Sequence, residues 1–95
     1  MSEKVLNGDY EIIQTLTVAD SVLVLAHNPN IPENDMSTPY VTWQANKELT
    51  DFYWGHYHKT LYAAQRDLVK RGAEKVRFYD RQHGFGKTHK ERDAR

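Results

Sequence analysis

With 95 residues, the chain is long enough for one small domain with a small core. The absence of cysteine excludes disulfides, thiol chemistry and thiolate-bound zinc, and no apolar run approaches the length of a membrane span. The 13 Lys and Arg residues balance the 13 Asp and Glu residues, but the two signs are separated along the chain. Residues 1–58 hold two basic and eight acidic residues, whereas residues 59–95 hold eleven basic and five acidic ones. The acidic part could meet a basic groove on a partner, and the basic part could attract phosphates.

Four segments in the first 58 residues have the composition of β-strands. The first is rich in β-branched residues, and the second contains a continuous apolar run, which predicts a central strand. A short link at residues 19–21 and a turn at residues 47–50 favour antiparallel hairpins. The predicted strands are residues 9–18, 22–28, 40–46 and 51–58.

The loop at residues 28–39 separates the second strand from the third. It contains all three prolines and is long for a connection in a small domain. Loops of this length are often functional or mobile, and such a loop could become ordered when a partner binds.

A helix follows the last strand. It begins near residues 58–60, where Thr60 can cap it, and Leu61, Ala64 and Leu68 follow helical spacing. Gly72 could end the helix, but the helical period continues to about Tyr79. Residues 80–95 are polar and glycine-broken, which predicts a flexible basic tail.

These elements predict an α+β fold. A four-stranded antiparallel meander would carry one long C-terminal helix on one face, in a single domain of residues 1–79. Residues 1–10 lack the apolar core of a secretory signal, so we expect a cytoplasmic protein.

The last two strands are unusually aromatic. Alternation along a strand places Phe52, Trp54 and His56 on one face, and it separates Tyr40 from Trp43. Gly55 inside the strand predicts a bulge or a close backbone approach. With one helix available, one face of the sheet is left uncovered. Its aromatic residues could pair across strands, anchor a protein interface or stack on bases, and the candidates are Tyr40, Phe52 and Trp54.

Two charged sets are candidate binding surfaces. The helix and tail carry a basic set that could contact phosphates, and the first half carries an acidic set that could mimic DNA. The basic candidates are Arg66, Lys70, Arg71, Lys75, Arg77 and Arg81. The acidic candidates are Asp9, Glu11, Asp20, Glu48 and Asp51. A solvated surface is the plain alternative for both sets.

The histidines raise the alternative of a metal-dependent enzyme. His56 and His58 are two apart on a strand, and His27 could add a third ligand from a neighbouring strand. No carboxylate-containing metal motif accompanies them, and no nucleophile motif occurs in the sequence. We therefore predict no catalysis, no metal and no cofactor.

Residues 39–71 resemble small proteins encoded on conjugative elements and plasmids of Gram-positive bacteria. The resemblance depends on one strand (Tyr40, Val41, Thr42, Trp43), a second strand (Tyr53, Trp54, Gly55, His56, Tyr57) and three helix residues (Ala64, Asp67, Arg71). His58 departs from the pattern, because an aromatic residue is expected there.

This resemblance implies a genomic context, a mobile element or phage, in which small non-enzymatic inhibitors of host defence occur. The function it suggests is stoichiometric inhibition of a type II CRISPR effector nuclease, through the effector or its guide RNA. An acidic surface would mimic DNA against the effector, whereas a basic surface would hold the RNA. The alternatives are a nucleic-acid-binding accessory protein of the conjugative element and a protein-interaction domain.

Overall fold

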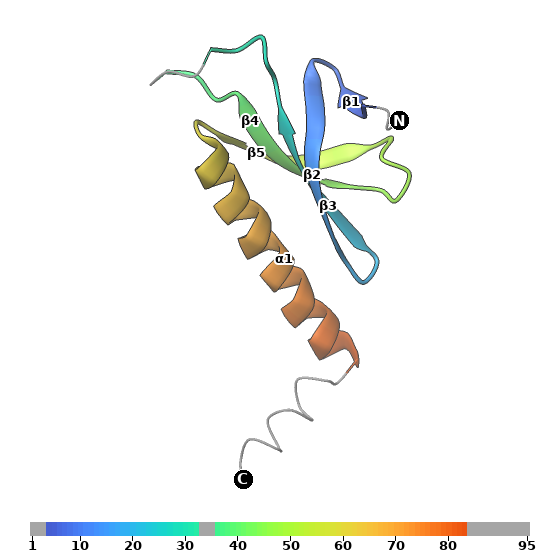
Figure 1. The fold of residues 1–95 in the computed structure, drawn as a ribbon. Helices are drawn as coiled ribbons and strands as arrows, with labels where there is room; N and C mark the ends of the chain where they lie inside the picture. The colour runs from blue at the N-terminus through green and yellow to red at the C-terminus, as the bar shows by residue number, and fades with distance from the viewer. Residues whose placement is uncertain (1–3, 33–35, 84–95) are drawn as a thin grey trace.

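The computed structural model describes residues 4–32 and 36–83 (Figure 1). A curled antiparallel sheet, with strand order β1-β2-β3-β4-β5, carries a single helix on one face. The elements are β1 (Leu6–Asn7), β2 (Tyr10–Val18), β3 (Ser21–His27), β4 (Tyr40–Ala45), β5 (Phe52–His58) and α1 (Leu61–His83). The predicted α+β class is confirmed, and the four predicted strands correspond to β2–β5. No helix within the described residues is long and apolar enough to cross a membrane.

The sheet has five strands rather than four because the chain before β2 also pairs. Leu6 lies opposite Glu11, and Asn7 lies opposite Tyr10. Gly8 makes the turn between them with a φ of 62°, a conformation that glycine adopts without steric cost. An Asn-Gly pair before an alternating segment is typical of a hairpin turn, so the sequence held the signal for this strand.

β3 is the centre of the sheet, as its apolar run predicts. Five consecutive residues, from Val22 to Ala26, are buried, so both faces of the strand are covered. Leu23 and Leu25 point to the helix side and pack with Tyr40, Ala64 and Leu68.

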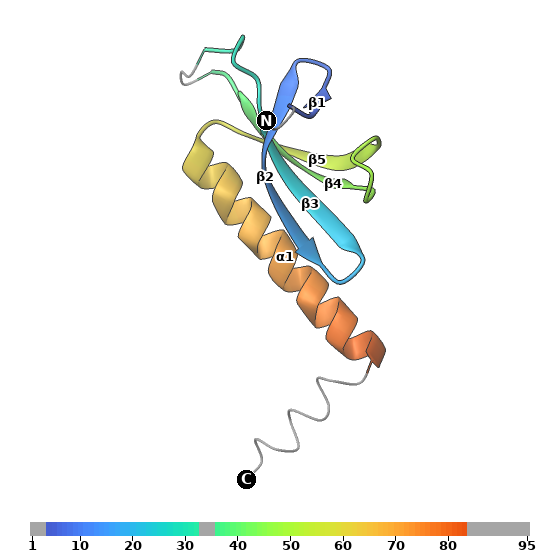
Figure 2. The same ribbon diagram turned by 45° about the vertical axis from the view of Figure 1, so that its right-hand side comes forward.

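α1 begins as predicted. Thr60 Oγ1 accepts a hydrogen bond from the Ala63 amide at 3.1 Å, which caps the first turn. Gly72 does not end the helix. A Cβ there would lie 2.5 Å from Leu16 Cδ2, so glycine lets the helix approach the sheet closely. Both views of the ribbon show α1 as one continuous helix along the sheet (Figures 1 and 2).

The predicted boundary between domain and tail at residue 80 is four residues early. Helical structure continues through His83, so residues 80–83 belong to α1 and not to a flexible tail. The rest of the predicted tail, residues 84–95, lies outside the described residues.

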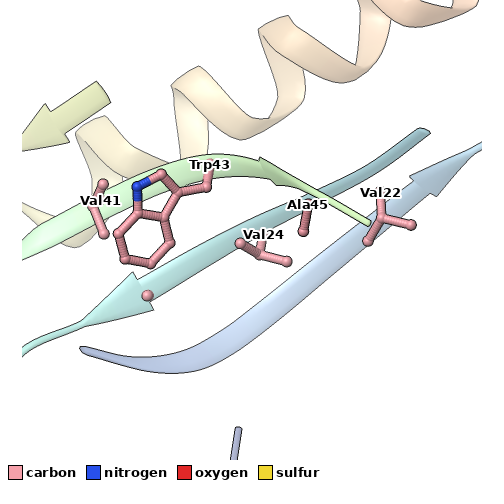
Figure 3. Close-up of a cluster of buried hydrophobic side chains, with 6 residues drawn as sticks. Val22, Val24, Val41, Trp43 and Ala45 are labelled. Atoms are coloured by element: carbon pink, nitrogen blue, oxygen red, sulfur yellow. The ribbon is translucent and has the colours of Figure 1, made fainter. Parts of the chain in front are cut away.

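The face of the sheet away from the helix is covered by the sheet itself. Trp43 is buried there beside Val24 and Val41 (Figure 3). The Tyr10 ring lies edge-to-face with the Trp43 ring, with 5.7 Å between the ring centres, and with the Tyr57 ring, with 6.2 Å between the centres. Tyr10 and Tyr57 come from β2 and β5, which are not neighbours, so the sheet curls enough to bring them together. The expectation of an uncovered face is therefore wrong.

A β-bulge interrupts β5. Thr42 pairs with His56 and Gln44 pairs with Tyr53, so Trp54 and Gly55 together oppose Trp43. The extra residue reverses the alternation. Phe52 packs with Trp43 on the face away from the helix, whereas His56 contacts Asp67 on the helix side. The predicted sharing of one face by Phe52, Trp54 and His56 is wrong for this reason, while the bulge expected at Gly55 is confirmed.

Candidate nucleic-acid interface

One flank of α1 carries an exposed row of basic side chains, which we call the basic row: Arg66, Lys70, Arg77 and Arg81. At about 100° per residue, the four positions lie within about 60° of one another around the helix axis. They extend over about 22 Å, since the rise is about 1.5 Å per residue. None of the four forms an ion pair within the described part of the chain. The row is therefore available to an external polyanion.

The other two predicted basic residues lie elsewhere. Arg71 is buried, and its Nη1 donates to the carbonyl oxygen of Thr42 at 3.1 Å and to Thr42 Oγ1 at 3.2 Å. Burial lowers the pKa of the Arg71 guanidinium, and the negative charges of Asp67 and Glu74 oppose that shift. Lys75 is partly buried, with its Nζ 6.0 Å from the centre of the Trp54 ring. The predicted basic set is thus divided between the surface and the interior.

A depression of about 460 Å³ lies beside the N-terminal end of the basic row. Its lining includes Arg66, Lys70, His58 and Asp67. The Arg66 guanidinium also lies over the exposed ring of Tyr62, 5.9 Å from its centre. An anion entering this depression would meet two cations and an imidazole, but also the Asp67 carboxylate.

Asp67 is the centre of a polar network that ties α1 to the sheet. Its Oδ2 accepts a hydrogen bond from Thr42 Oγ1 at 2.5 Å and lies 2.9 Å from His56 Nδ1. His58 Nε2 is 3.5 Å from the same oxygen; it is buried and has no hydrogen-bond partner among the described residues. Burial alone would raise the pKa of Asp67, but the hydrogen bonds from Thr42 and His56 and the nearness of both histidines outweigh it and lower the pKa.

This network is what sequence reasoning missed. His56 and His58 were considered as metal ligands with His27, but both face Asp67, and the His27 ring stacks on Tyr40 at 4.7 Å. Within residues 4–32 and 36–83, no group of three or more His, Asp or Glu side chains could hold a metal ion. Alternation places His56 and His58 on one face of their strand, but it is the register of β4 and β5 that brings His56 beside Thr42.

The acidic candidates do not form one surface. Asp9 and Glu11 lie at the β1–β2 turn. Asp20 lies in the β2–β3 turn, at the opposite end of β2, and its Oδ1 is 4.0 Å from Lys47 Nζ. Glu48 and Asp51 are in the β4–β5 turn, which is at the same end as Asp20. The five carboxylates are thus divided between the two ends of the sheet.

The three aromatic candidates are also separated. Tyr40 is buried under the helix, and Phe52 is half-buried on the opposite face. Trp54 is 67% exposed, with Tyr53 beside it at 5.1 Å in an edge-to-face arrangement. Of the three, Trp54 alone presents a largely open ring.

The chain matches no protein-family model, no curated protein and no solved structure. What it binds is therefore inferred from its own surface chemistry.

Proposed function

We propose that this protein is a non-enzymatic nucleic-acid-binding protein that holds a phosphate backbone along the basic row. The observation that carries the proposal is the alignment, on one flank of α1, of four exposed cations that form no ion pair with the described residues. Phosphate contacts of this kind supply most of the affinity of sequence-independent binding. A row about 22 Å long is able to contact several successive phosphates.

The resemblance to mobile-element proteins suggests the biological target. Of the two modes of CRISPR inhibition that it implies, DNA mimicry requires the acidic residues on one surface, and they lie at two ends of the sheet. The basic row favours the mode that engages RNA. We therefore propose the guide RNA of a type II effector, in the cytoplasm of the bacterial host, as the target of stoichiometric inhibition.

A nucleic-acid-binding accessory protein of the conjugative element is the second candidate. It would use the same basic row without any effector partner. The basic row favours both candidates equally, so they must be separated by the effector rather than by binding alone.

The first experiment tests binding. Fluorescence anisotropy of a labelled 20-nucleotide RNA should show an affinity that falls steeply with salt. Four phosphate contacts predict a slope of about −3 in log K against log salt for a single strand. A variant with Arg66→Glu, Lys70→Glu and Arg77→Glu should lose most of this binding and most of the slope.

The matched control reverses three acidic residues in the β2–β3 and β4–β5 turns: Asp20→Lys, Glu48→Lys and Asp51→Lys. It changes the charge by the same amount with the opposite sign, so it should retain or strengthen binding. If the control weakened binding as much as the basic-row variant did, the proposed surface would be wrong.

The second experiment tests the target. DNA cleavage by a type II effector is measured with the protein added before or after guide loading. Inhibition only before loading supports action on the guide RNA, and inhibition in both orders supports binding to the assembled effector. Retained RNA binding without inhibition of any effector would favour the accessory protein.

A further inference from the structure

We propose that Trp54 is a base-stacking anchor, and that the nucleic acid bound by this protein is therefore single-stranded. This inference rests on the proposed function and adds the class of ligand to it. It depends on the backbone of Trp54, on the exposure of its ring and on the groups around that ring.

The backbone of Trp54 is strained. Its φ is 59°, in the left-handed region where a bulky side chain is a true outlier. Such a conformation is energetically unfavourable and persists only where the surroundings enforce it. The next residue, Gly55, lies with its backbone against the buried Trp43 indole, and an ideal Cβ there would be only 2.8 Å from Nε1. This contact helps to fix the bulge and leaves Trp54 as the extra residue.

Burial of the Trp54 side chain does not offset this strain. The Trp54 side chain is 67% exposed, although tryptophan has much to gain from a core position. Strained residues of this kind concentrate at ligand sites, where the strain is part of the preorganisation.

The surroundings of the ring fit a nucleotide. Tyr53 packs edge-to-face against the indole and limits its movement, and the Lys75 ammonium lies 6.0 Å from the ring centre. A base stacked on the open part of the indole would place its phosphate near Lys75, which lies about 120–180° around the helix axis from the basic row. A flexible single strand could continue from there around α1 to the row. Aromatic stacking joined to a cationic strip is the usual chemistry of single-strand binding. The bases of a duplex are stacked on one another and cannot make this contact.

Tryptophan fluorescence provides a direct test, because Trp54 and Trp43 are the only tryptophans in the sequence. Trp43 is 7% exposed, so quenching on binding reports mainly on Trp54. Three probes are titrated into the full chain: a 20-nucleotide oligo(U), a duplex of the same length, and polyphosphate, which has the charge but no bases. We expect oligo(U) to quench the fluorescence and to bind more tightly than the duplex, and we expect polyphosphate to bind without quenching.

Two variants complete the test. Trp54→Asn removes the ring and keeps a residue that tolerates positive φ, so it should weaken oligo(U) binding by roughly 5- to 150-fold and leave polyphosphate binding unchanged. Trp54→Phe keeps an aromatic face and should stay within about threefold of the wild type. Circular dichroism of each variant confirms that the fold is retained.

The outcomes separate this inference from the proposed function. Equal binding of all three probes, with no effect of Trp54→Asn, would overturn the stacking anchor and leave the basic row as a general phosphate-binding site. Failure of every probe to bind would overturn both, and would direct attention to a protein partner for Trp54.

Discussion

β3 and β5 both contain seven residues and lie two positions apart in the same sheet, but their environments are opposite. β3 buries five consecutive residues, from Val22 to Ala26, between the helix and the curled face. β5 exposes five consecutive residues, from Tyr53 to Tyr57, at the edge of the sheet. Both strands are rich in hydrophobic side chains, so composition does not explain the difference. The difference follows from position in the sheet, because β3 is the central strand and β5 is an edge strand.

This contrast separates stability from binding. A central strand stabilises the fold by removing apolar surface from water, and it has no freedom to carry strain. An edge strand contributes less to the core, and a bulge there can turn a side chain outward and disrupt unwanted pairing. β5 carries the strained Trp54 and one end of the Asp67 network, while β3 supplies the stability that makes both possible.

The largest expected effect is the loss of a β3 side chain. Leu25 is fully buried, so Leu25→Ala should lower the free energy of unfolding by about 2–5 kcal/mol. On β5, Tyr57→Ala should lower the free energy of unfolding by about 1 kcal/mol or less. Tyr57 is 55% exposed, and the substitution removes its ring contact with Tyr10. Urea unfolding of both variants measures the difference. Equal losses would mean that β5 is as much a part of the core as β3.

The Asp67 network should give the next largest effect. Asp67→Asn removes a charge that Thr42 and both histidines face, and this charge also favours the charged form of the buried Arg71. We expect a loss of about 2–3 kcal/mol at pH 7. Asp51→Asn, at an exposed turn, is the control for the change in charge and should cost less than about 0.5 kcal/mol.

The same substitution predicts a pH dependence. The folded-state pKa of Asp67 is lowered, so its contribution to stability is fully present above the ordinary carboxyl pKa of about 4. That contribution is lost as the pH falls through the lowered folded-state pKa. The unfolding free energies of the wild type and Asp67→Asn should therefore converge below about pH 4. A constant difference down to pH 2 would contradict the assigned ionisation.

Periodicity in the sequence predicts the part of the fold that burial controls. The apolar run of β3 indicates a central strand, and the spacing of Ala64 and Leu68 indicates the covered stripe of α1; both are confirmed. β1 was missed because two residues are too few for a periodic pattern, and the Asn7-Gly8 pair was its one signal in the sequence. The boundary at residue 80 was misplaced because helix α1 continues where its sequence is almost entirely polar.

The candidate site was less predictable because it depends on contacts between distant segments. Arg71 has the composition of a phosphate ligand, but its neighbour Gly72 brings this turn of the helix against the sheet, where Thr42 accepts its hydrogen bonds. The individual basic residues could be predicted from the sequence. Their arrangement as an exposed row that leaves out Arg71 could not. Gly55 indicated the bulge, but the outward turn of Trp54 depends on the packing of Trp43.

Substitutions at two glycines compare the tightly packed contact of Gly55 with Trp43 and the more adaptable contact of Gly72 with Leu16. Gly55→Ala places a Cβ 2.8 Å from the buried Trp43 indole, and we expect a loss of about 1–2 kcal/mol in unfolding free energy. Gly72→Ala meets the flexible end of Leu16, and the gain of about 1 kcal/mol in helix propensity offsets the clash. Its net effect should lie within about 1 kcal/mol of zero. Thermal unfolding of both variants compares them, and a larger loss for Gly72→Ala would mean that the helix contact is the more rigid.

The smallest expected effect on stability belongs to the most exposed aromatic of β5. Trp54→Asn loses the contacts with Tyr53 and Lys75, each worth about 0.5–1 kcal/mol at an exposed site, but it relieves part of the cost of positive φ for a bulky residue. The two terms are similar in size, so the free energy of unfolding should change by less than about 1 kcal/mol. Urea unfolding of Trp54→Asn beside Trp54→Gly, which relieves the strain more fully, measures the balance. If Trp54→Gly is the more stable of the two, then the wild-type backbone carries strain at this position. A loss above about 2 kcal/mol in both variants would instead make Trp54 a structural residue.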